Sequence, residues 1–181
     1  KRINDLAGTS LAMDQFTQRA FEIVATAKAA DAFNLNKESE ATRNHYGRTH
    51  IGQAMLLARR LVEAGVTFVS VRDREWDDHG QIEGRMKILR PRFDRALAAL
   101  ITDLYQRGLD RRVLLVAMGE FGRTPRINRN AGRDHWAPVM SVVFSGGSLR
   151  MGQIIGSSTA LGDAPKDNPY RPDHVLSLVY R

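Results

Sequence analysis

Hydrophobic and polar positions along the chain follow two kinds of pattern. Apolar residues recur three and four positions apart in four stretches, which predicts helices over residues 11–30, 51–63, 85–108 and 174–181. Three short, continuous apolar runs rich in β-branched residues predict buried strands, namely VTFVSV (66–71), VLLVAM (113–118) and MSVVF (140–144). Residues 31–46 carry alternating charges and are predicted to be a connector.

Strands that alternate with helices are typical of the α/β class, in which a mostly parallel sheet is covered by helices on both faces. In such sheets the carboxyl ends of the strands meet at one edge, and ligands bind there. The chain has 181 residues, which is enough for one domain of this kind with a sizeable core. Polar side chains that follow the predicted strands are therefore the first candidates for a ligand-binding or catalytic site.

Three polar loops adjoin the predicted strands: RDREWDDHG after 66–71, GEFGRTP after 113–118, and AGRDHW before 140–144. Carboxylates and neutral imidazoles bind divalent ions such as Zn²⁺, Mn²⁺ and Ca²⁺. The loops offer four candidate metal ligands, Asp77, His79, Glu120 and His135. Guanidinium groups can hold phosphate or sulfate oxygens in pairs, and the candidates for this role are Arg123 and Arg133.

Each loop also has a plainer interpretation. The run DDHG is an ordinary turn sequence, and GEFG could be a surface turn with Glu120 in solvent. Arg133 and Asp134 could form an ion pair beside Trp136, and Thr124 fits a turn better than a nucleophile. None of the spacings matches a compact zinc motif, so the residues alone indicate a metal or anion site without deciding between these interpretations.

Composition narrows the classes of protein. Hydrophobic residues make up 43% and charged residues 26%, as in soluble globular proteins. The chain has no cysteine, which excludes disulfides and thiolate metal sites. The net charge of +7 is spread along the chain, which favours a solvated basic surface over a nucleic-acid interface. Every apolar run is shorter than the roughly 18 residues of a membrane span.

Four segments together resemble one known family. They are YGRTHIGQAMLLARRLVEAGVTFVSV (46–71), WDDHG (76–80), GEFGRTPRINRNAGRDHW (119–136) and DNPYRPDHVLSLVY (167–180). The chain is similar through these segments to the domain of unknown function 1501 family, which is sulfatase-like and is placed in the alkaline phosphatase superfamily. The resemblance covers nearly the whole chain, and the segment over 119–136 is its longest and most specific motif.

The resemblance implies a three-layer α/β/α fold and a metal-dependent hydrolase of small phosphate or sulfate esters. It implies that Asp77 and His79 share one metal ion, that Glu120 helps to bind a second, and that His135 completes the set. Zn²⁺ is the expected ion, with Mn²⁺ or Ca²⁺ as alternatives, and Asp134 supports the site beside His135. Phe121 follows Glu120 where many members of the superfamily have a histidine, so one imidazole ligand of a two-metal site is missing here.

Members of the family are longer, and residues 1–45 do not resemble their N-terminal half. The resemblance thus implies that this single domain, residues 1–181, is the C-terminal part of a longer domain, and that the nucleophile lies outside the chain. The partner would be the missing half or a second copy, and export of sulfatase-like relatives suggests a periplasmic or secreted protein. The alternative is a non-catalytic binding or structural protein that keeps the fold and part of the metal site.

Overall fold

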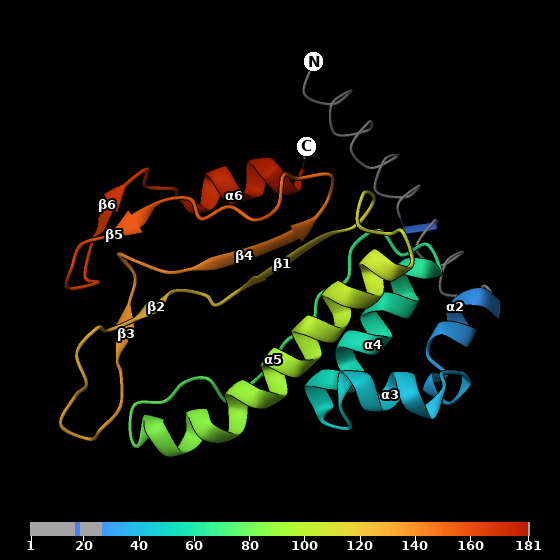
Figure 1. Ribbon diagram of the computed structural model, residues 1–181, viewed down its shortest axis with the longest axis horizontal. Coiled ribbons are helices and arrows are strands. Elements are labelled where there is room, and N and C mark those ends of the chain that lie inside the picture. The colour runs from blue at the N-terminus through green and yellow to red at the C-terminus, as the bar shows by residue number, and fades with distance from the viewer. Residues whose placement is uncertain (1–16, 19–26, 181) are drawn as a thin grey trace, which may run out of the picture. The chain divides into compact units, whose positions relative to one another are not determined.

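The computed structural model describes residues 17–18 and 27–180 (Figure 1). The chain divides into two compact units, residues 1–72 and residues 73–181. The helix predicted over residues 11–30 falls mostly outside the described residues, and its end coincides with the start of α2 (Ala27–Ala32). In the part of the chain that is described, every helix is too short or too polar to cross a membrane.

The described part of the first unit is helical. After α2 come η1 (Leu35–Lys37), α3 (Glu40–Tyr46) and α4 (His50–Glu63). The Ser39 hydroxyl accepts the Thr42 N–H at 3.0 Å and begins α3, and the Thr49 hydroxyl accepts the Gly52 N–H at 3.3 Å and begins α4. The prediction of α4 is confirmed to within one residue. The prediction of a connector over 31–46 is wrong at α3, because a short charged helix has no apolar periodicity to reveal it.

Two arginines on α4 tie the first unit together through one buried carboxylate. Arg59 and Arg60 both contact Glu38, with Arg59 Nη2 at 2.9 Å from Oε2 and Arg60 Nη1 at 2.5 Å from Oε1. The side chain of Arg59 is 1% exposed and that of Glu38 is 10% exposed. Because these charges lie away from water, the network holds only as long as each group keeps its partner.

The predicted strand over residues 66–71 is wrong. These residues follow α4, but they pair with no other strand among the described residues, and the Phe68 side chain lies exposed. A strand needs backbone hydrogen bonds to a neighbour, whereas β-branched residues alone set only an extended preference. The apolar run therefore indicates a preference for extended backbone. The segment does not form a strand because no neighbouring strand among the described residues pairs with it.

The first helix of the second unit is the long α5 (Ile82–Gln106), which follows the loop over residues 73–81, and its last is the short α6 (Pro172–Val179). Between them lie six short strands: β1 (Leu114–Met118), β2 (Gly122–Arg123), β3 (His135–Trp136), β4 (Val142–Gly146), β5 (Ser157–Ser158) and β6 (Pro165–Asp167). Figure 1 shows β1 and β4 side by side. In α5, which covers most of the helix predicted over 85–108, Leu89, Leu100 and Leu104 are buried.

The sheets contradict the predicted mostly parallel, three-layer α/β/α fold. The described strands form three two-stranded antiparallel sheets, which pair β1 with β4, β2 with β3, and β5 with β6. A parallel pair requires a crossover connection, usually a helix, to bring the chain back to the same end. The connection from β1 to β4 holds the β2–β3 hairpin instead, so β4 returns antiparallel, with Val116 opposite Phe144.

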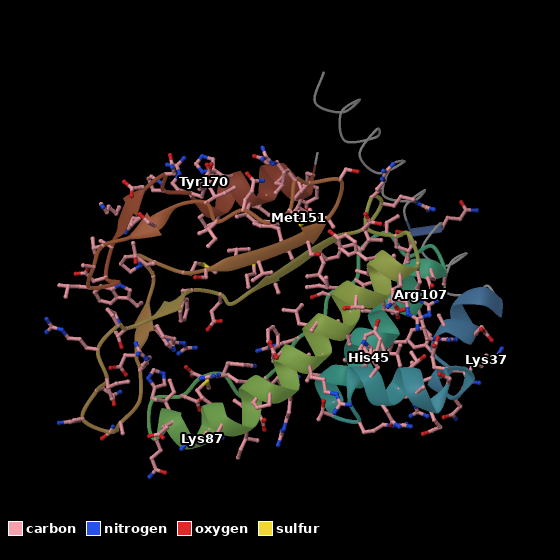
Figure 2. All side chains as sticks on the ribbon, in the orientation of Figure 1. Lys37, His45, Lys87, Arg107, Met151 and Tyr170 are labelled. Atoms are coloured by element: carbon pink, nitrogen blue, oxygen red, sulfur yellow. The ribbon has the colours of Figure 1, made fainter. Side chains whose placement is uncertain are left out.

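Beyond β4 the chain carries several large apolar side chains on its surface. Ile154, Leu161 and Tyr180 are exposed, as are Met151 and Tyr170, which Figure 2 labels. None of the residues of α6 is buried.

Candidate metal centre

Two loops that are distant in the sequence lie side by side through backbone hydrogen bonds. Gly80 and Ala131 form an isolated antiparallel bridge. Ile82 N donates to Ala131 O at 2.9 Å, and Arg133 N donates to Asp78 O at 3.0 Å. This irregular ladder brings the WDDHG loop against the loop between β2 and β3. The two motifs predicted to carry ligands are therefore joined by their main chains.

The close approach of these loops depends on Gly132. A Cβ atom at this position would lie 2.0 Å from the His79 carbonyl carbon and 2.2 Å from the Gly80 nitrogen. No side chain fits at such distances from backbone atoms, and the backbone cannot yield without breaking the ladder. Glycine is thus required here because another strand of backbone passes directly over it.

The first loop is anchored on α5. The Arg85 side chain forms an ion pair with the Asp78 carboxylate and donates from Nη2 to Glu75 O at 2.9 Å. Trp76 packs edge-on against Phe93, with ring centroids 5.5 Å apart. Asp78 is buried, whereas Asp77 on one side of it is exposed. The buried contacts of Asp78 and Trp76 fix the loop so that Asp77 is presented outward.

The second loop is shaped by the β2–β3 hairpin. Arg123 lies directly opposite His135 in the ladder, so both side chains leave the same face. Thr124 N extends the pairing by donating to Asp134 O at 2.8 Å. The Phe121 ring lies 4.5 Å from the His135 ring between centroids and supports the imidazole from one side.

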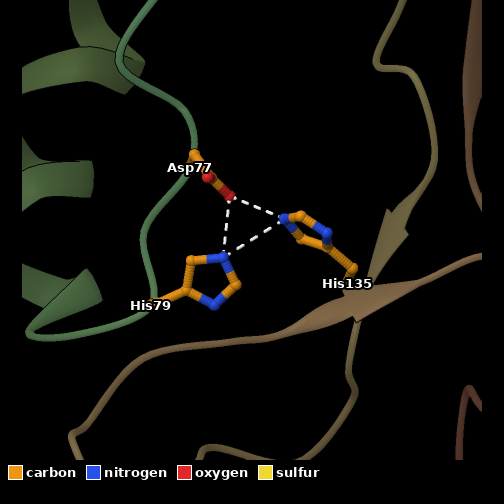
Figure 3. A group of neighbouring side chains, drawn as sticks. All are labelled: Asp77, His79 and His135. Carbon is orange, nitrogen blue, oxygen red and sulfur yellow. Dashed lines mark hydrogen bonds and ion pairs between the residues drawn. The ribbon is translucent and has the colours of Figure 1, made fainter.

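Three predicted ligands meet where the loops join (Figure 3). Asp77 Oδ1 lies 3.0 Å from His79 Nε2 and 2.9 Å from His135 Nε2. The two Nε2 atoms are 3.2 Å apart. The side chains are 63%, 46% and 49% exposed in the order Asp77, His79, His135, so the cluster is open to small molecules.

Asp77 is held as a carboxylate. The hydrogen bond from His135, followed by the bond that Arg123 Nη1 donates to Oδ1 at 2.5 Å, lowers the pKa of Asp77 to about 2. Asp77 is therefore ionised throughout the physiological range. One of its oxygens is the point on which both imidazoles and the guanidinium converge.

Asp134 lies behind His79. Its Oδ1 is 2.9 Å from His79 Nδ1, and the bond raises the pKa of His79 and lowers that of Asp134. An ionised carboxylate can only accept a hydrogen bond, so Nδ1 carries the proton. The lone pair of a neutral His79 then lies on Nε2, which is the atom that faces Asp77 and His135.

The other predicted residues lie outside the three-residue cluster. The Glu120 carboxylate is 62% exposed and accepts from Arg123 Nη2 at 3.1 Å, so it is linked to Asp77 only through that guanidinium. The Arg133 guanidinium donates to the Thr124 carbonyl oxygen and secures the hairpin. The Thr124 hydroxyl donates to Arg126 O at 2.9 Å and accepts from Asp134 N at 3.0 Å, which commits it to the hairpin.

In a comparison with known protein families, the chain matches the family described as Protein of unknown function (DUF1501) over residues 4–181. The chain belongs to this family. No curated protein and no solved structure matches it.

In this member of the DUF1501 family the donor set can be tested against the needs of a metal ion. A tetrahedral zinc centre has bonds of about 2.0–2.2 Å to imidazole and carboxylate, which separates the donor atoms by about 3.3 Å. The donor atoms here lie 2.9–3.2 Å apart, close to that value. The Asp134–His79 contact is the arrangement that fixes ligand histidines in metalloproteins. The residues fit a divalent ion.

One residue of the site was missed at the sequence level. Asn128 lies inside the segment over 119–136 but was not among the candidate residues, and it contacts both Asp134 and the His79 backbone. The run RINRNAG shows only a turn, because nothing local reveals that an asparagine side chain will face a neighbouring loop.

Proposed function

We propose that this chain is a metal-dependent hydrolase of phosphate or sulfate esters, with its ion held by Asp77, His79 and His135. The observation that carries the proposal is the meeting of one carboxylate oxygen and two imidazole nitrogens at 2.9–3.2 Å. Hydrolytic zinc sites use three protein ligands of this kind and leave a fourth position for water or substrate. The exposure of all three side chains supports access for a small ester.

The donor set favours Zn²⁺. Ca²⁺ takes six to eight oxygen ligands, and a pair of imidazoles is a poor match for it. Imidazole together with carboxylate suits Zn²⁺, and Mn²⁺ is the next candidate. The chain has no cysteine, so the softer thiolate ligands play no part.

The surrounding side chains support ester hydrolysis. A Zn²⁺ ion bound here would polarise an ester oxygen and lower the pKa of a water molecule. Asp134 keeps the proton of His79 on Nδ1 and leaves Nε2 free to bind. Arg123 places a permanent positive charge against Asp77, which favours an anionic substrate such as a phosphate or sulfate ester.

The resemblance of the WDDHG and GEFGRTP motifs to those of sulfatase-like proteins supports the choice of ester. Under this proposal Glu120 remains the predicted ligand of a second ion, since Arg123 connects its carboxylate to Asp77. Thr124 is not the nucleophile in this proposal, because its hydroxyl is committed to the hairpin. The nucleophile would come from a partner polypeptide or from activated water.

The first test is the Zn²⁺ affinity of the purified chain, measured by competition with a chromophoric chelator. The variant is the His79→Ala, His135→Ala double substitution. The matched control is His50→Ala with His174→Ala, which removes two exposed histidines outside the cluster. We expect near-stoichiometric Zn²⁺ in the wild type and the control, and loss of binding in the cluster variant.

The second test is turnover of an aryl phosphate and an aryl sulfate by the Zn²⁺-loaded protein. Hydrolysis of either ester that disappears with His135→Ala supports the proposal and selects the ester class. Zn²⁺ binding without turnover of either ester favours a non-catalytic protein that keeps the metal site. Equal Zn²⁺ binding by the wild type and the cluster variant would overturn the assignment of ligands.

A further inference from the structure

Asn128 makes four hydrogen bonds with its side chain. Its Oδ1 accepts from Asn130 N and from Gly132 N, both at 2.9 Å. Its Nδ2 donates to Asp134 Oδ1 at 3.0 Å and to His79 O at 3.1 Å. Backbone N–H groups can only donate, so the atom that faces Asn130 and Gly132 must be the oxygen, and the orientation of the amide is fixed.

The two ends of this amide serve different purposes. The oxygen closes the turn that carries Gly132, and with it the close contact between the loops. The nitrogen reaches across to the first loop at His79 O and to the carboxylate behind the His79 ring. Both contacts of Nδ2 therefore bear on the same imidazole, one through its backbone and one through its hydrogen-bond partner.

We propose that Asn128 is a positioning residue of the metal centre, which holds Asp134 against His79 Nδ1 so that His79 Nε2 faces Asp77 and His135. The inference rests on the proposed metal site. Asn128 lies outside the ligand cluster and acts only through Asp134 and the His79 backbone. Outer groups of this kind orient ligands and typically change metal affinity about 10–100-fold.

The decisive variant is Asn128→Asp. Aspartate has the shape of asparagine, and its oxygen can still accept from Asn130 N and Gly132 N, which preserves the turn. The other oxygen would replace Nδ2 and face two acceptors, Asp134 Oδ1 and His79 O, so both contacts become repulsive. Asn130→Asp is the matched control, because it adds the same charge in the same loop at a residue that meets Asn128 through its backbone nitrogen, which the substitution keeps.

Three measurements separate positioning from stability. The first is Zn²⁺ affinity by chelator competition, where we expect a loss of about 10–100-fold for Asn128→Asp and little change for Asn130→Asp. The second is the tautomer of His79 in the metal-free protein, from ¹⁵N NMR of the imidazole nitrogens. We expect the Nδ1–H tautomer to dominate in the wild type and to lose its majority in Asn128→Asp. The third is Tm, which shows whether the turn survives.

Wild-type Zn²⁺ affinity in a folded Asn128→Asp protein, or an unchanged tautomer of His79, would overturn the proposal. If Asn128→Asp does not fold, Asn128→Ser replaces it, because a serine hydroxyl can accept from the turn but is too short to reach Asp134. Failure of the wild type itself to bind Zn²⁺ would contradict the proposed function. The tautomer of His79 would then still decide the role of Asn128.

Discussion

The Nε2 atoms of His79 and His135 lie 3.2 Å apart, although 56 positions separate the two residues in the chain. Two neutral imidazoles that both direct a lone pair at this distance would repel each other. The arrangement is stable when a proton on one ring lies between them, as in the hydrogen bond from His135 to Asp77, or when a metal ion does. Under the proposed function, protons and a metal ion therefore compete for this pair.

Replacement of Asp134 by asparagine should weaken metal binding and leave the fold largely intact. An asparagine can turn its amide N–H toward His79 Nδ1 and favour the wrong tautomer, which takes the lone pair away from the cluster. We expect Zn²⁺ affinity to fall about 10–100-fold. Chelator competition measures the change, and Asp173→Asn, which alters an exposed carboxylate on α6, should bind Zn²⁺ as the wild type does.

Zn²⁺ affinity should depend on pH through His79. The hydrogen bond to Asp134 raises the pKa of His79 above its ordinary value of 6.5, so the imidazolium form, with protons on both Nδ1 and Nε2, persists to higher pH than in a free imidazole. Zn²⁺ must displace the Nε2 proton while Nδ1 keeps the proton bonded to Asp134, and binding should weaken as pH falls, with the decline beginning above pH 6.5. Titrations between pH 8.5 and 5.5 test this, and an affinity that is flat down to pH 6 would contradict it.

Gly132→Ala should disrupt the site and the fold around it. The new methyl group would lie 2.0 Å from the carbonyl carbon of His79, and the two loops would have to separate. We expect a loss of about 3 kcal/mol in unfolding free energy, at the upper end for overpacking, together with loss of Zn²⁺ binding. Gly84→Ala on α5 meets no atom within 4 Å and should keep both, with a slight gain in stability from helix propensity.

Glu38→Ala should destabilise the first unit. The substitution removes one of two carboxylates that contact Arg59, whose side chain is 1% exposed, and leaves Glu63 Oε2 at 2.6 Å from Nη1. Because Glu63 remains, we expect a cost below the roughly 3–5 kcal/mol of a buried charge that has lost every partner, which a thermal or urea melt would detect. Glu83→Gln changes a carboxylate that is 83% exposed on α5 and should alter the melt by less than about 0.5 kcal/mol.

The contribution of Glu38 should also depend on pH. Burial raises the pKa of Glu38, but hydrogen bonds from Arg59 and Arg60 outweigh burial, and the net effect lowers it below 4.5. A lowered pKa in the folded state means that the stabilisation is complete above pH 4.5 and is lost as pH falls through the folded value. The difference in Tm between wild type and Glu38→Ala should therefore shrink in acid, and a constant difference would contradict the mechanism.

Sequence patterns correctly predicted the helices and strands that are stabilised mainly by residues close to one another in the chain. The 3.6-residue spacing of apolar positions predicted α4 and most of α5. An amphipathic helix can be predicted in this way because its backbone hydrogen bonds all form within the same segment. The apolar run over 113–118 gave β1, which starts one residue later. The short helix α3 was not predicted, because its N-terminal cap at Ser39 lies within a run of charged residues. The prediction of a strand over 66–71 was wrong, because the sequence of a segment does not show whether a second strand will pair with it.

The candidate site shows the same division. Residue types and motifs singled out Asp77, His79 and His135 as candidate ligands, and the sequence alone determined that both loops carry side chains of the kinds that can bind a metal ion. The expectation that they converge at the edge of a parallel sheet was wrong in its cause, since the described sheets are antiparallel. Only the tertiary structure decided that Gly132 lets the loops touch, that Asn128 joins them, and that Glu120 stays with Arg123. The chemistry of a side chain follows from the identity of its residue and can be read from the sequence. Pairing between distant segments depends instead on backbone hydrogen bonds, which nearly every residue can make whatever its side chain. Which segments pair is therefore decided only when the whole chain folds.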